Sequence, residues 1–473
     1  MAVPRLPAAY FGLSKSKGHR SISWRVLGNP SFRCYFIGSV TSDFGTWLQN
    51  TAQVLLAYRL SHSVLVVGLV TCAQFSSPLV LGPWAGVMTD RFGGRRILFA
   101  TQLTAATLAG LMALLAFFGE MHTRWLGCGA LVSGLAFTFA LPARNVTVRR
   151  LVSADDARPA FAMDSVSYNL GRAVAPPVSV VLVTTLGFGW AFAANSLSFL
   201  IFAGCLVLAG HGQPAERHEK SQLRDGFKAT RRDWRIGVLL LMVAAVTVAD
   251  DPVLVLGPAL AAHLHVSPSW SGWFIAALGA GTVLGSFLPS LHTPSVRLAA
   301  SALAALAVCM MLFILSPSVW GCFFAAFGAG VMCLIANSAT RTELATRAGP
   351  AGEASVMAVW AIAWAGSKPI ASLTDGLLAS GIHLNWSGVH VSWDGVGIKL
   401  TGVLLAIPAL IPVAMLITLA LMVVAVRKWK PSEGRPLAQP LETVANFPWI
   451  RRAEELLVSA PQPEIIEEAR IRA

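Results

Sequence analysis

Long apolar segments follow one another along almost the whole chain, and short polar stretches separate them. A segment of about 20 apolar residues crosses the roughly 30 Å hydrocarbon core as a helix. A helix also satisfies its own backbone hydrogen bonds inside a bilayer, so the pattern indicates an all-α membrane protein. Twelve transmembrane helices are predicted, at 32–60, 64–89, 95–118, 125–149, 159–184, 188–210, 236–262, 268–291, 297–315, 318–340, 352–379 and 400–426.

The longest polar interruption between predicted helices, residues 211–235, divides them into two groups of six. This hydropathy symmetry is typical of transporters with repeated halves, whose substrate site lies near mid-membrane between the halves. The predicted organisation is a cytoplasmic N-terminal segment, a six-helix bundle, a cytoplasmic linker, a second six-helix bundle and a cytoplasmic tail, at residues 1–31, 32–210, 211–235, 236–426 and 427–473.

Composition and charge agree with this topology. Charged residues make up 12% of the chain against about one quarter in a soluble protein, and the mean hydropathy is +0.64. Most lysines and arginines, which give the net charge of +13, lie in polar segments that the predicted helices place on one side of the membrane. The segments on the other side contain only three basic residues, Arg59, Arg124 and Lys399. By the positive-inside rule, both termini are cytoplasmic and the protein is a multi-pass protein of the cytoplasmic (inner) membrane. The basic charge therefore does not indicate nucleic-acid binding, and we expect a monomer in the lipid bilayer.

Catalytic and metal-binding patterns are not apparent in the sequence. The seven cysteines lie in or beside apolar helices and show no metal-ligand spacing. No Ser/His/Asp grouping is apparent either. We therefore expect no enzyme, no metal and no cofactor.

One short turn between apolar segments, Gly86 to Arg96, combines an acid, three arginines and three glycines. Its pattern, G-x-x-x-D-R-x-G-x-R-R, resembles the loop between the second and third helices of major facilitator superfamily transporters. The resemblance implies a cytoplasmic gate loop formed by Gly86, Asp90, Arg91, Gly93, Arg95 and Arg96.

Three further segments narrow the resemblance to the enterobactin-exporter-like and macrolide-efflux-like branch of that superfamily. They are 29–33 (NPSFR), 142–145 (PARN) and 164–172 (DSVSYNLGR). The resemblance implies the major facilitator fold and proton-driven export by rocking of two bundles. Two features depart from it: the fifth helix lacks the Gly-rich antiporter pattern before its proline, and Asp250-Asp251 matches no family motif.

Several predicted helices contain ionisable residues, which cost several kcal/mol in a membrane unless they are paired or hydrated. We therefore predict that the candidates for transport and proton coupling are Asp43, Arg144, Asp250, Asp251 and Lys368. Arg172 and Asp375 are predicted structural charges. Snorkelling to the interface is an alternative role for Arg144, and a plain salt bridge to Asp375 is an alternative for Lys368.

The adjacent acids Asp250 and Asp251 point about 100° apart on a helix and can face different partners. We expect one to pair with a cation across the cavity and the other, if desolvated, to carry a proton near neutral pH. Two other patterns carry structural predictions. Gly281-x-x-x-Gly285 indicates close helix packing. The alternation in 381–399 indicates an external hairpin cap, and a long loop without a particular role is the alternative.

The sequence is therefore interpreted as a secondary transporter. We expect a proton-coupled exporter that uses the proton gradient to move a small amphipathic molecule, such as a siderophore or a drug, by alternating access. Two alternatives stay open: a lysophospholipid-type lipid transporter of the same fold, and a transport-inactive membrane scaffold that docks a biosynthetic enzyme through its tail.

Overall fold

The computed structural model describes residues 24–153, 156–210, 223–287, 295–380, 383–386 and 389–392. The first half of the chain begins with a short 3-10 helix, η2 (Trp24–Gly28). Six long helices follow: α1 (Pro30–Ser61), α2 (Val64–Phe92), α3 (Gly94–Phe117), α4 (Thr123–Leu151), α5 (Ala157–Thr185) and α6 (Phe188–Leu208). The predicted tail and the predicted helix 400–426 lie outside the described residues, so the twelve-helix count stays a prediction.

The second half begins with a short helix that the hydropathy did not predict, α7 (Leu223–Arg232). The remaining helices are α8 (Trp234–Asp250), α9 (Pro252–Val255), α10 (Gly257–His263), α11 (Trp270–Phe287), α12 (Val296–Leu315) and α13 (Val319–Ser380). The strands β1 (His383–Trp386) and β2 (Val389–Ser392) pair antiparallel, so the predicted hairpin is confirmed.

The helix predicted over 236–262 is wrong in one respect, because the structure divides it into α8, α9 and α10. Two prolines explain the division: Pro252 and Pro258 have no N–H to continue the helical ladder. The helices predicted at 318–340 and 352–379 also meet more closely than expected. Their helical segments join at Gly349, where φ is 66° and only a glycine is comfortable.

Within the described residues, nine helices are long and apolar enough to cross a membrane, which confirms a multi-pass membrane protein. α1 is not among the nine, although it packs against both α5 and α6. The reason lies in its sequence, because Asp43, Gln49 and Gln53 are buried polar residues that lower its hydropathy.

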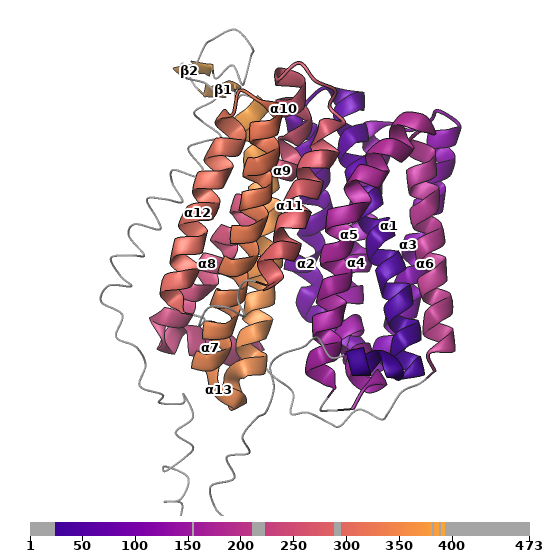
Figure 1. Cartoon of the computed structure of the whole chain (residues 1–473), viewed down its shortest axis with the longest axis vertical. Coiled ribbons are helices and arrows are strands. Elements are labelled where there is room, and N and C mark those ends of the chain that lie inside the picture. Colours follow the sequence, from indigo (N-terminus) through magenta and orange to yellow (C-terminus); the bar gives the residue numbers. More distant parts are fainter. Residues whose placement is uncertain are drawn as a thin grey trace, which may run out of the picture.

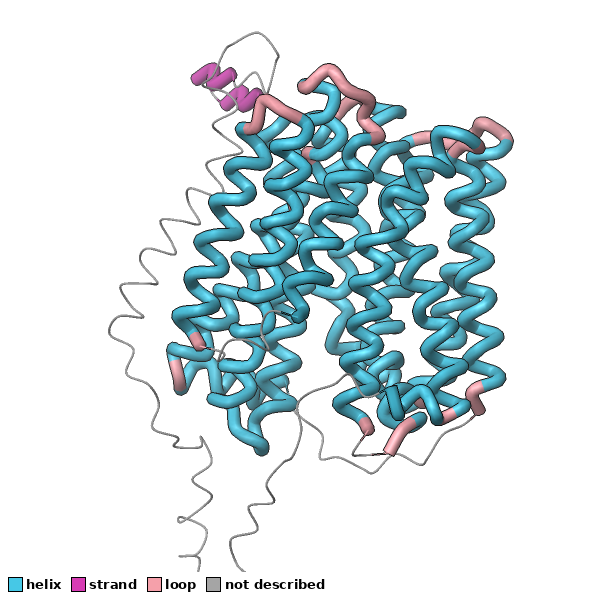
Figure 2. Tube along the Cα trace, in the orientation of Figure 1, coloured by secondary structure: helices cyan, strands magenta, loops and turns pink. Residues whose placement is uncertain are grey.

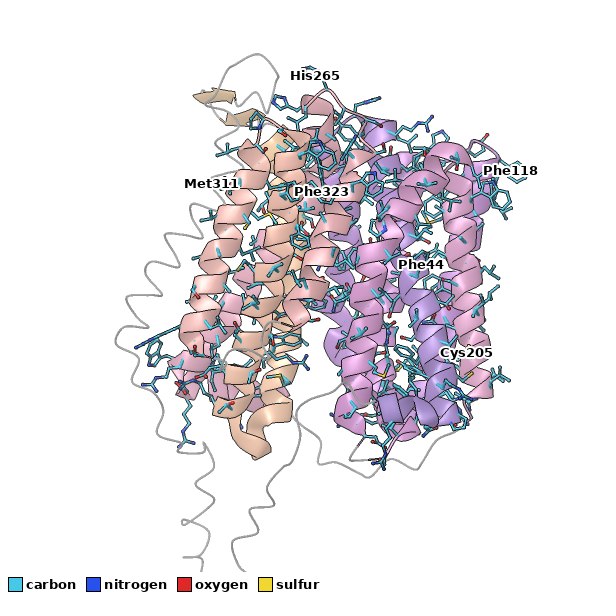
Figure 3. All side chains as sticks on the ribbon, viewed as in Figure 1. Phe44, Phe118, Cys205, His265, Met311 and Phe323 are labelled. Atoms are coloured by element: carbon cyan, nitrogen blue, oxygen red, sulfur yellow. The ribbon has the colours of Figure 1, made fainter. Side chains whose placement is uncertain are left out.

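The helices form two bundles that run side by side (Figure 1). Phe118 and His265 lie at the end that carries α10, and Cys205 lies toward the opposite end (Figure 3). The bundles approach each other at the α10 end and diverge toward the α7 end (Figure 2).

Glycines mark where the bundles meet. A Cβ on Gly68 of α2 would strike the Ser372 carbonyl of α13 and lie 3.1 Å from the Gly376 Cα. A Cβ on Gly279 of α11 would lie 2.7 Å from the Ala173 Cα of α5. Because these contacts need the absence of a side chain, the α2–α13 and α5–α11 seams are close backbone contacts.

Close packing also holds each bundle together. Gly281 and Gly285 of α11 face the backbone of the first part of α13, at Phe327 and Val331, as the Gly-x-x-x-Gly spacing predicts. In the first bundle, Gly171 of α5 lies against the backbone of α1 at Asp43. That contact brings the polar faces of α1 and α5 together.

Candidate functional site

Two groups of charged side chains occupy the interior, and the first lies within the first bundle. Arg144 of α4 donates to both oxygens of Asp43 on α1, at 2.8 Å from Nη1 and 2.7 Å from Nη2. Its Nε donates to Asp164 of α5 at 3.0 Å. We call this group the N-bundle cluster; its uncharged members are Tyr35, Ser39 and Ser167.

The hydroxyl groups complete the shell around the two carboxylates. Ser167 donates to Asp43 at 2.6 Å, and Tyr35 donates to Asp164 at 3.1 Å. The side chains of Asp43 and Arg144 are 8% and 18% exposed. One arginine thus faces the buried carboxylate of Asp43 and the half-buried carboxylate of Asp164, which leaves a formal excess of one negative charge that a proton or another cation can neutralise.

The second group bridges the two halves. Arg172 of α5 donates to Asp250 of α8 at 2.7 Å. Lys368 of α13 lies 3.3 Å from the Asp251 carboxylate and 4.0 Å from that of Asp250. We call these four residues the interface cluster. Its two acids and two bases are formally balanced, and the pair across the halves is the Arg172–Asp250 bridge.

The interface cluster lies where the seventh predicted helix is broken. α8 ends at Asp250, and Asp251 precedes Pro252, the first residue of α9. Asp251 is completely buried and accepts from Ser372 at 2.6 Å. Broken helices at mid-membrane are a common way of building ion and substrate sites in transporters.

Aromatic rings accompany both cations of the interface cluster. Arg172 lies 5.4 Å from the Trp47 ring centroid, and Lys368 lies 5.2 Å from that of Phe75. Trp364 and Trp360 precede Lys368 on α13 at four-residue intervals, and their rings stack with an interplanar angle of 8°. This face of α13 thus combines a cation with flat apolar surfaces.

The predicted gate loop lies at the α7 end, between α2 and α3. Asp90 is exposed and forms no ion pair with any other described residue. Arg91 and Arg96 are also exposed, Gly86 lies in α2, and Gly93 adopts a φ of 88° at the turn. Arg95 points to the last turn of α6, where it donates to the Leu206 and Val207 carbonyls at 2.9 and 3.2 Å.

The remaining predicted charges have definite neighbours. Lys368 pairs with Asp251 and Asp250 and makes no salt bridge to Asp375, so the alternative of a Lys368–Asp375 pair is not realised. Arg144 does not snorkel, because its guanidinium is held by the two acids. Asp375 is buried, and within the described part of the chain neither carboxylate oxygen has a hydrogen-bond partner.

Sequence reasoning missed four members of the N-bundle cluster, namely Asp164, Tyr35, Ser39 and Ser167. In the sequence, Asp164 stands out only as part of the 164–172 motif. Helical spacing carries the signal that could have found these residues. Tyr35, Ser39 and Asp43 are four residues apart and share a face of α1; Asp164, Ser167 and Gly171 likewise share a face of α5.

Residues 21–433 match a known family, described as transmembrane secretion effector, of the major facilitator superfamily. The match covers far more than half of the chain. The protein belongs to the major facilitator superfamily. The predicted fold class and the predicted resemblance to the enterobactin-exporter-like branch are thereby confirmed.

The curated relatives include enterobactin exporters. The exporter EntS of Citrobacter koseri is 26% identical over 273 residues, which is 57% of this chain and 65% of the relative. EntS of Shigella flexneri is 25% identical over 54% of this chain and 62% of the relative. The matched region is thus less than two thirds of the length of these relatives. The relatives are exporters and not enzymes, which agrees with the expectation from the sequence.

Solved structures of low sequence identity share the fold. A bacterial homologue of the human lysosomal transporter Spinster, in an inward-facing and unoccupied conformation, matches with a TM-score of 0.60 at 15% identity, over 84% of this chain and 96% of that one. The nucleoside transporter NupG matches with a TM-score of 0.64 at 12% identity, over 85% and 100%.

Proposed function

We propose that the protein is a proton-coupled exporter of a small amphipathic molecule, such as a siderophore or a drug, and that it works by alternating access. The observation that carries this proposal is the Arg172–Asp250 bridge. It joins the two halves beside a broken helix, next to the seams at which they touch. A rocking motion that separates the halves must break this bridge, so the bridge couples the charge state of the interior to conformation.

The N-bundle cluster supplies the proposed proton site. Its excess carboxylate lies inside one half, so the site stays intact while the halves rock. Protonation of Asp43 weakens its hold on Arg144 and frees the guanidinium for another partner. A proton gradient then drives the cycle without any cofactor.

The substrate class follows from the interface cluster and its aromatic neighbours. The stacked rings of Trp360 and Trp364 offer flat apolar surfaces, and Lys368 lies one turn further along the same face. Such a face suits a ligand with aromatic rings and a negative charge. The enterobactin exporters among the relatives support an export function of this kind.

The proposed topology follows from the distribution of charge. The exposed arginines Arg91 and Arg96 lie at the α7 end, with exposed Arg231 and Arg232 of α7. By the positive-inside rule this end faces the cytoplasm, so both termini are cytoplasmic and the halves diverge toward the cytoplasm. We propose that a single copy acts in the cytoplasmic membrane, with its pathway between the two halves that the Arg172–Asp250 bridge joins.

The lipid-transporter alternative would be favoured by an apolar portal between the halves. An apolar groove of about 500 Å³ does exist, but it is lined by α7, α8 and α13, including Trp234, Leu241 and Ala363. All three helices belong to the second half, so the groove does not favour that alternative. The scaffold alternative depends on residues 431–473, which lie outside the described residues. Export that survives deletion of 431–473 would argue against it.

The proposal is tested by efflux of enterobactin and of a macrolide from cells that lack their own exporters. Asp43→Asn and Asp250→Asn are expected to abolish proton-dependent efflux at normal membrane expression. Glu120→Gln, which removes an exposed carboxylate between α3 and α4, is the matched control and is expected to leave efflux unchanged. Unchanged efflux in both aspartate variants would refute the coupling role.

A further inference from the structure

Asp375 is a buried carboxyl group that the proposed mechanism does not use. The residue is 2% exposed, and both of its carboxylate oxygens are buried without a hydrogen-bond partner among the residues that the structure describes. An ionised carboxylate in such a place costs several kcal/mol, because water is removed and no donor replaces it. Burial without a donor therefore favours the neutral acid over the carboxylate.

Of the neighbouring charges, Asp251 opposes ionisation of Asp375, and its effect is larger than the opposite effect of Lys368. Lys368, the cation on the same helix, lies beside Asp251 and Asp250. The charged groups that act on Asp375 are Asp251 and Lys368, and Asp251 repels a second negative charge. Among the described residues, α2 contributes only the thiol of Cys72 to this region. The helices α9 and α11 contain no titratable side chain.

The position of Asp375 links this neutral state to conformation. Its neighbour Gly376 packs on α2, where an added Cβ would lie 3.2 Å from the Leu65 Cα and 3.4 Å from the Gly68 Cα. One turn before Asp375, the Ser372 carbonyl meets Gly68 as well. Asp375 is therefore carried by the stretch of α13 that forms the α2–α13 seam, and separation of the seam admits water to it.

We propose that Asp375 is a second proton-binding site, which holds its proton while the α2–α13 seam is closed and releases it when the seam opens. On opening, the O–H bond of the acid breaks and the proton passes to an entering water molecule, which leaves a hydrated carboxylate. On closing, a hydronium ion returns the proton before water is expelled. This inference rests on one part of the proposed function, which is that the α2–α13 seam opens and closes.

Infrared spectroscopy of the purified full-length protein in lipid nanodiscs tests the proton directly. The closed protein is expected to show the carbonyl stretch of a protonated carboxylic acid without hydrogen bonds. Asp375→Asn is expected to remove this band, and the control Glu120→Gln to retain it. If Asp375→Asn does not fold, Asp375→Glu takes its place and is expected to shift the band. A spectrum that neither substitution changes would overturn the proposal.

The thiol of Cys72, which lies on α2 and senses the Asp251 charge, offers a reporter of seam opening. In a variant that keeps Cys72 and replaces the other cysteines by alanine, labelling by a water-soluble thiol reagent is measured against pH. The same measurement in the Asp375→Asn variant gives the pH dependence of labelling that comes from the Cys72 thiol alone. Raising the pH removes the Asp375 proton and favours the open seam, so labelling of the parent is expected to rise more steeply than labelling of Asp375→Asn.

One proton limits the additional rise to about tenfold per pH unit. Asp375→Glu is expected to restore the steep dependence, since it restores a titratable group. Equal pH dependence in the parent and in Asp375→Asn would refute the link between the proton and the seam. Neither experiment uses a substrate, so its failure is distinguishable from a loss of efflux in Asp43→Asn.

Discussion

The N-bundle cluster and the interface cluster contain similar side chains but differ in what holds their members together. Arg144, Asp43 and Asp164 all belong to helices of one bundle. The interface cluster takes Arg172 from the first half and its other three members from the second. A rigid rocking motion therefore preserves the first group and divides the second. The comparison indicates that one cluster is suited to keep a proton through the cycle, and the other to respond to conformation.

Removal of Arg144 is expected to have the largest effect on stability. Arg144→Ala leaves the buried Asp43 and the half-buried Asp164 without their cation, and breaking a buried pair such as Arg144–Asp43 costs about 3–5 kcal/mol. Thermal unfolding of the purified protein in detergent measures the loss. Arg33→Ala, at an exposed site near the start of α1, is the control and is expected to unfold like the parent. A stable Arg144→Ala protein would show that the cluster does not hold the first bundle together.

Loss of the Arg172–Asp250 bridge is expected to change conformation more than stability. Arg172→Ala removes the only member from the first half, so it favours separated halves by about 1–3 kcal/mol, or roughly 5–150-fold. Distances between spin labels at the α10 ends of α2 and α13 measure this shift. The charge exchange of Arg172→Asp with Asp250→Arg is expected to recover part of the parent distribution. Unchanged distances in Arg172→Ala would remove the distinction between the two clusters.

A side chain at Gly68 is expected to wedge the seam open. Gly68→Val places atoms against the Ser372 carbonyl and Gly376, and overpacking of this kind costs the closed state about 1–3 kcal/mol. The same spin-label distances report the change. Gly204→Val on α6 is the control, because a Cβ there meets nothing within 4 Å. If both variants give the parent distances, the α2–α13 seam is not the surface that closes.

The smallest effect is expected at Arg95. Arg95→Ala removes two charge-assisted bonds to the last carbonyls of α6, at a partly exposed helix end, and costs about 0.3–1 kcal/mol. Because Arg95 ties α3 to α6 within the first bundle, its loss is not expected to change spin-label distances between the halves. Unfolding of Arg96→Ala, the exposed neighbour, supplies the reference. A large change in inter-half distance would give Arg95 a gating role.

Much of the fold could be predicted because each helix needs about 20 apolar residues whatever its neighbours are. The bounds of α2 to α6 lie close to the predicted ranges for this reason. The breaks at Pro252 and Pro258 have local causes and could have been predicted as well. The helix α7 was missed because a short charged helix leaves no hydropathy signal.

The candidate site could be predicted only as a set of unpaired charges. Asp43, Arg144, Asp250 and Lys368 stand out in the sequence because an ionisable group in an apolar segment is costly. Their partners depend on which faces of distant helices meet. Arg172 illustrates this limit: the sequence predicts it as a structural charge, but its partner, Asp250, lies 78 residues away on α8 of the other half.

The sequence alone settles that this chain crosses the membrane many times, that it divides into two halves and that it carries costly charges inside. These properties depend on local composition, because each segment must itself be apolar enough to cross the hydrocarbon core. Tertiary structure decides that Arg144 holds two acids within one half, that Arg172 reaches across to Asp250, and that Asp375 has no hydrogen-bond partner among the described residues. These properties depend on pairwise distances between helices, which close packing at Gly68 and Gly171 sets and which no local pattern encodes.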